Sequence, residues 1–146
     1  MSRRAIILRE TIVSIVINMV ITAGFFFALF GLGGPIAGAA YGQDFLPQSF
    51  MVALMGALIP GLLVRRGSRA SISKVIVRAV LLAIGALLVG CLCWWLFART
   101  GTLQPVPALI IKLAYAAIVS VIVTPNSVGA TLTDMERTRR GQEVTS

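Results

Sequence analysis

Four polar residues recur at intervals of four along an otherwise apolar stretch, namely Glu10, Ser14, Asn18 and Thr22. Each step of four residues turns only about 40° around a helix, so these side chains form one slanting polar stripe. Polar side chains within a membrane helix normally face the bundle and bond to neighbouring helices. The same stripe could instead form part of a pathway for a polar solute or a proton, with Glu10 at its mouth. The sequence leaves both interpretations open.

Lys112 is the one charge well inside an uncharged run. A lysine near the end of a membrane helix can extend its side chain to the interface at modest cost, and this is the simplest expectation. The alternative is a bonded partner, and Asp44 is the only carboxylate expected on the same side of the membrane. Gln48, one turn further along, could join them. Such a cluster of Asp44, Gln48 and Lys112 would be a binding site for something polar in the outer leaflet.

The sequence offers few residues for catalysis or for metal binding. The chain contains no His, which removes the commonest general base and the commonest metal ligand. Cys91 and Cys93, with Met51 and Met55, raise the possibility of copper(I), which prefers sulfur ligands. The two cysteines, however, point about 200° apart on a helix. We therefore expect no enzyme activity, no metal site and no cofactor.

The composition predicts the elements that position these residues. Of 146 residues, 58% are hydrophobic and only 12% are charged, whereas a soluble domain is about 25% charged. A membrane helix needs about 20 mostly apolar residues, and four runs qualify, at 11–30, 45–64, 75–98 and 107–124. The sequence thus predicts an all-α integral membrane bundle of four transmembrane helices over 1–125, followed by a polar tail over 126–146.

The charge distribution predicts orientation. The net charge is +8, and Lys and Arg near the ends of spans mark the cytoplasmic side. Eleven basic residues precede the first span, follow the fourth or lie between the second and third, whereas only Arg99 occupies the other two connections. We expect two antiparallel hairpins with both termini in the cytoplasm. The basic loop is expected to contact anionic lipid, rather than nucleic acid, through Arg65, Arg66, Arg69, Lys74 and Arg78.

Small residues four apart allow membrane helices to approach closely. Three of the four spans carry such stripes, and we therefore expect a compact bundle. The stripes comprise Ala53, Ala57 and Gly61; Ala79 and Ala83, with Ala86 and Gly90; and Ala116, Ser120 and Thr124.

These features favour a small structural or accessory protein of a membrane assembly, because no broken helix or midplane charge typical of transporters is evident. The alternative is a small oligomeric transporter or channel for a polar solute or ion, which would use the stripe and Lys112. The preference for Arg over Lys and the high Ala content are typical of GC-rich bacterial genomes. The expected location is therefore a bacterial inner membrane, in a homo-oligomer or a larger complex.

Overall fold

The computed structural model describes residues 2–65 and 71–145. The long helices in this part of the chain are α1 (Arg3–Leu29), α3 (Phe45–Arg65), α4 (Ile72–Phe97) and α5 (Pro105–Thr145). A one-and-a-half-turn helix, α2 (Gly38–Gln43), leads into α3, and two short strands are β1 (Ile36–Ala37) and β2 (Thr102–Leu103). The expectation of an all-α chain is confirmed, since four helical segments are long and apolar enough to cross a membrane.

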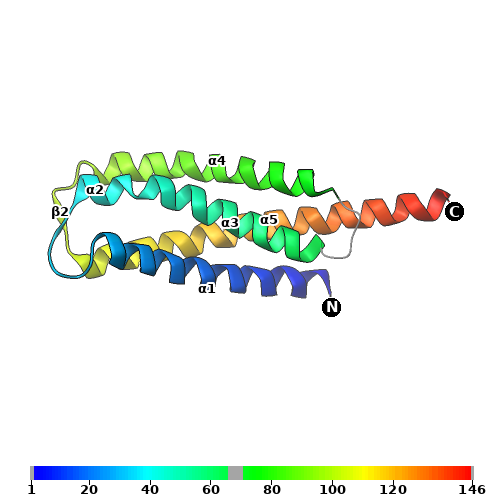
Figure 1. Cartoon of the computed structure of the whole chain (residues 1–146), viewed down its shortest axis with the longest axis horizontal. Helices are drawn as coiled ribbons and strands as arrows, with labels where there is room; N and C mark the ends of the chain where they lie inside the picture. The colour runs from blue at the N-terminus through cyan, green and yellow to red at the C-terminus, as the bar shows by residue number, and fades with distance from the viewer. Residues whose placement is uncertain (1, 66–70, 146) are drawn as a thin grey trace.

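The long helices lie side by side along one axis, and both chain termini lie at the same end of the bundle, here called the terminal end (Figure 1). At the opposite end β1 and β2 pair antiparallel, with Ile36 opposite Leu103 and Ala37 opposite Thr102. We call this the strand end. This strand pair joins the connection that follows α1 to the connection that follows α4.

The helices do not pack as two separate hairpins, which corrects one expectation from the sequence. The main packing pairs are α3 with α4, α1 with α5, and α3 with α5, whereas α1 touches α3 only slightly and α4 touches α5 only slightly. Helices α3 and α5 therefore form the centre of the bundle, with α4 on one side and α1 on the other. As a result α1 and α4 leave most of their surface uncovered.

The residue types on the buried faces explain this arrangement. The buried face of α1 is mostly polar, comprising Glu10, Thr11, Ser14, Asn18, Thr22 and Phe26, and α5 offers it hydroxyl groups. The contact between α3 and α4 instead uses small residues, which bring two backbones close. All members of the small-residue stripes expected from the sequence are buried, and five of the alanines have no exposed surface: Ala53, Ala57, Ala79, Ala83 and Ala116. The prediction of close helix packing is confirmed.

Helix α5 is longer than the fourth apolar run. It continues through Pro125 to Thr145, so the polar residues after 125 begin as part of the same helix. Pro125 removes one backbone donor, yet the next turn is held by packing, because Ser127, Val128 and Thr131 are buried. The Ser127 hydroxyl also donates to the Ala57 carbonyl oxygen at 2.7 Å. These tertiary contacts outweigh the local tendency of proline to end a helix.

Candidate functional site

The polar stripe of α1 faces inward over its whole length. Glu10, Ser14, Asn18 and Thr22 are each at most 5% exposed. The structure therefore brings all four onto the face that packs against α5 and α3. This placement follows from the spacing of four, which puts the polar groups on one side of a helix whose other sides are apolar.

Asn18 and Ser14 bond across the middle of the bundle. Asn18 Nδ2 donates to Ser120 Oγ of α5 at 2.8 Å, and it lies 3.4 Å from Ser14 Oγ. Thr124 Oγ1 lies 2.9 Å from Ser14 Oγ and 2.9 Å from the Gly56 carbonyl oxygen of α3. Gly56 makes this three-helix contact possible, since a Cβ atom there would sit 3.3–3.5 Å from Ser14, Asn18 and Thr124. The stripe thus joins α1, α3 and α5.

The next turn of α1 connects this layer to Lys112. Gln48 of α3 lies between the two, with its Nε2 3.3 Å from Thr22 Oγ1 and 3.4 Å from the Lys112 carbonyl oxygen. Its Oε1 accepts a hydrogen bond from Lys112 Nζ at 3.0 Å. Gln48 therefore uses both ends of its amide, and its position is fixed from two sides.

The Lys112 side chain is buried and paired, and it does not extend to an interface as the simplest expectation had it. Its side chain is 1% exposed, and Nζ lies 2.6 Å from Asp44 Oδ2, with an exposed fraction of 17% for the Asp44 side chain. Asp44 stands at the junction between α2 and α3, where the chain turns back into the bundle. The structure thus brings Asp44, Gln48 and Lys112 together, as the alternative interpretation of the sequence had it.

Aromatic rings surround the Lys112 ammonium group, a feature that the sequence alone did not reveal. Nζ lies 4.3 Å from the centre of the Phe45 ring, 4.9 Å from that of Tyr41 and 6.0 Å from that of Phe30. A cation within about 6 Å of a ring centre is attracted by the negative face of the ring. The spacing of Tyr41 and Phe45, four apart beside Asp44, was the available signal.

Further hydrogen bonds and ring contacts hold these aromatic side chains in place. The Tyr41 hydroxyl donates to the Ala108 carbonyl oxygen at 2.8 Å, and Phe45 stacks on Phe97 of α4 with ring centres 5.4 Å apart. The Tyr115 and Ser49 hydroxyl oxygens are 2.6 Å apart. Residues of α2, α3, α4 and α5 therefore all contribute to the enclosure around Lys112, with Phe30 from the connection that follows α1.

Other predicted site residues lie at the terminal end. Glu10 pairs with the exposed Arg9 of its own helix at 2.5 Å. Arg65 is the last residue of α3, Lys74 lies in the first turn of α4, and Arg78 pairs with Asp134 of α5 at 3.3 Å. Arg66 and Arg69 lie outside the described residues. Of the residues predicted to contact anionic lipid, Arg65 thus lies on α3, whereas Lys74 and Arg78 lie on α4.

Almost every buried polar side-chain atom in the described part of the chain has a hydrogen-bond partner. In residues 2–65 and 71–145, Arg78 Nη1 is the one buried side-chain nitrogen or oxygen without a hydrogen-bond partner. No group of three His, Cys, Asp or Glu within these ranges could hold a metal ion. A surface cavity of about 460 Å³ reaches Asp44 at the strand end, between Leu29 and Phe30 on one side and Gln43 and Pro47 on the other. A polar group in this cavity would meet the partly exposed carboxylate before the buried lysine.

Comparison with protein-family models, with curated protein sequences and with solved structures finds no match to this chain.

Proposed function

We propose that this protein is a structural or accessory component of a membrane assembly. The proposal rests on one observation: the polar side chains inside the bundle are hydrogen-bonded to other groups of the protein. Asn18, Ser14 and Thr124 bond to one another or to a backbone carbonyl, and the Lys112 ammonium is occupied by Asp44 and Gln48. Groups engaged in this way stabilise one helix arrangement and leave few donors for a passing solute.

The outer faces of α1 and α4 support the same proposal. In both helices about a fifth of the most apolar stretch, 22%, is buried inside the chain. Large apolar side chains cover the remainder, including Val20 at 66% exposed and Leu88 at 69%. Lipid can cover such faces, and so can another subunit. An accessory subunit would use one of these two faces for its partner.

Gentle purification tests this proposal. The tagged full-length protein is extracted in a mild detergent, and its mass in the native state and its co-purifying proteins are measured. We expect a stoichiometric partner of a different sequence that remains bound through size-exclusion chromatography. Crosslinks from that partner should fall on the exposed faces of α1 or α4. A protein that elutes alone, as a monomer or a homo-oligomer, would contradict the proposal.

A small oligomeric transporter or channel remains the second candidate. It is favoured by one observation: polar residues follow each other from Glu10 at the terminal end to Asp44 at the strand end, where the 460 Å³ cavity opens. Its test is proton flux into proteoliposomes, followed with a pH-sensitive dye. For a transporter we expect flux above that of empty vesicles, abolished by Asn18→Leu and retained by Asn126→Leu. Asn126 is exposed, and among the described residues its side chain bonds to the Ile122 carbonyl oxygen of its own helix, so it is a matched control.

We further propose that both termini face the cytoplasm of a bacterial cell, on the inner membrane. The proposal rests on the eleven basic residues assigned to one side of the membrane. A C-terminal fusion to green fluorescent protein is expected to fluoresce, and a C-terminal fusion to alkaline phosphatase is expected to be inactive. The reverse pair of results would place the terminal end outside. A phosphatase fusion within the connection that follows α1, at Gly33, provides the opposite expected result as an internal control.

A further inference from the structure

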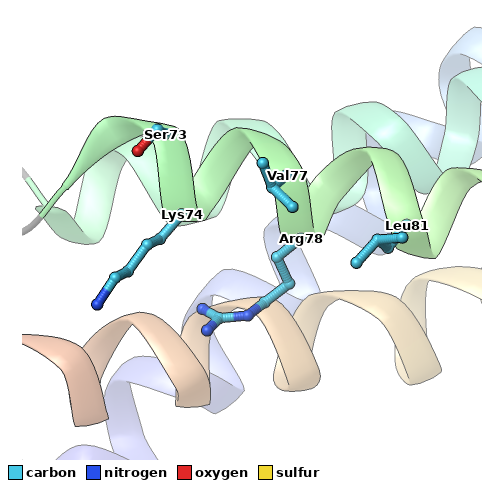
Figure 2. A pocket seen from close by; sticks show the side chains of 5 residues that line it. All are labelled: Ser73, Lys74, Val77, Arg78 and Leu81. Atoms are coloured by element: carbon cyan, nitrogen blue, oxygen red, sulfur yellow. The ribbon is translucent and has the colours of Figure 1, made fainter.

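A cavity of about 350 Å³ lies on the surface of α4 near the terminal end. It is lined by Ser73, Lys74, Val77, Arg78 and Leu81. The spacing of these residues places them on one side of the first turns of α4. Figure 2 shows that the Lys74 and Arg78 side chains extend from α4 toward the neighbouring helix, α5, while Val77 lies between them on α4 and Leu81 lies beyond Arg78. The cavity therefore has a cationic part and an apolar part.

The positive charge in the cationic part is only partly neutralised. Arg78 Nη2 lies 3.3 Å from Asp134 Oδ2, but Arg78 Nη1, which is buried, has no hydrogen-bond partner among the described residues. Lys74 forms no ion pair with any residue in the ranges that the structure describes. Of the two cations, Arg78 is thus paired with one carboxylate, and Lys74 is not part of that ion pair. An anion placed here would meet both the Lys74 ammonium group and the Arg78 guanidinium, whose side chain is 30% exposed and for which a phosphate is a well-matched acceptor.

The apolar part points to an amphiphile rather than a soluble anion. Val77 is 57% exposed and Leu81 is 63% exposed. Val77 lies between the two cations along α4, and Leu81 lies about one turn beyond Arg78, toward the apolar span. From Lys74 to Leu81 the helix rises about 10 Å at 1.5 Å per residue. This matches the change from a headgroup to the upper part of an acyl chain.

We propose that the groove formed by Lys74, Arg78, Val77 and Leu81 is a binding site for an anionic phospholipid, whose phosphate bonds to the two cations. Basic pockets between membrane helices bind anionic headgroups in this way. The acyl chain then packs along Val77 and Leu81. The bound lipid lies against α4 at the terminal end, next to the Arg78–Asp134 pair that joins α4 to α5.

Native mass spectrometry of the full-length protein tests this site. The detergent-solubilised protein is titrated with phosphatidylglycerol and, separately, with phosphatidylcholine. We expect preferential binding of phosphatidylglycerol, weakened about fivefold by Lys74→Gln and further by adding Arg78→Gln. Arg99→Gln is the matched control, because it removes one positive charge at the opposite end of α4, where Arg99 stacks 3.7 Å over the Trp95 ring, and it should leave binding unchanged.

Two further variants separate lipid binding from a loss of structure. Asp134→Asn breaks the ion pair but keeps both cations, so it should bind the lipid as tightly as the natural protein or more tightly. Leu81→Ser should weaken lipid binding while all charges remain. Equal binding of the two lipids, or equal losses in Lys74→Gln and Arg99→Gln, would overturn the proposal. Glycerol 3-phosphate binding as tightly as phosphatidylglycerol would also overturn it, in favour of a soluble phosphate ligand.

Discussion

Asp44→Asn is expected to lower the free energy of unfolding by about 3–5 kcal/mol, the usual result of removing one partner from a buried ion pair. The reason is that Lys112 is 1% exposed and would remain buried without the carboxylate that pairs with it. Lys112→Met should cost less, because the Asp44 side chain is 17% exposed and can regain contact with water. The double variant leaves no buried charge, so it should be more stable than the sum of the two losses implies.

The measurement is a double-mutant cycle on unfolding in mixed micelles of mild detergent and dodecyl sulfate. We expect a coupling energy of about 2 kcal/mol or more between Asp44 and Lys112, within the range measured for contacting residues. The control cycle uses the exposed pair of Arg3 and Glu136, 3.6 Å apart with side chains 46% and 56% exposed. That pair should couple by at most about 1 kcal/mol. Equal coupling in the two cycles would show that the aromatic enclosure adds nothing to the pair.

Gly90→Ala is expected to lower the free energy of unfolding by about 1–3 kcal/mol, as forced overpacking does. A Cβ atom at Gly90 would lie 2.5 Å from Ser49 Oγ and 2.9 Å from the Phe45 carbonyl oxygen of α3. Because one of these atoms is backbone, α3 and α4 must separate. The shift would also disturb Phe45, which lies 4.3 Å from Lys112 Nζ. A change on α4 would therefore reach the ion pair.

The matched control for this substitution is Gly85→Ala on the same helix. A Cβ atom at Gly85 would meet nothing within 4 Å, and alanine favours a helix over glycine by up to about 1 kcal/mol. Unfolding in the same mixed micelles should therefore show Gly85→Ala as stable as the natural protein or slightly more so. Similar losses at both positions would mean that helix propensity, and not the α3–α4 contact, decides the effect.

Much of the candidate site could be predicted from the sequence, but its partners could not. The inward direction of the α1 stripe follows from spacing alone, because the other faces of that helix are apolar. From the sequence, Ser120 and Thr124 are expected only as small residues that allow close packing. In the structure they also bond to Asn18 and Ser14. These bonds join residues more than 100 positions apart, and no local pattern specifies such pairs.

The amino-acid sequence by itself determined the four apolar helices and the close packing of their small-residue faces. Both follow from local rules: a run of apolar side chains must leave water, and residues four apart share a helix face. The tertiary structure decided which helices pack together, and it decided that the Lys112 side chain is buried beside Asp44. Apolar helix faces are nearly interchangeable in a bundle, so hairpin partners in the sequence need not be partners in space. The turn at α2 and α3 places Asp44 beside a lysine 68 residues away, and a buried charge is stable only where the whole fold supplies its partner.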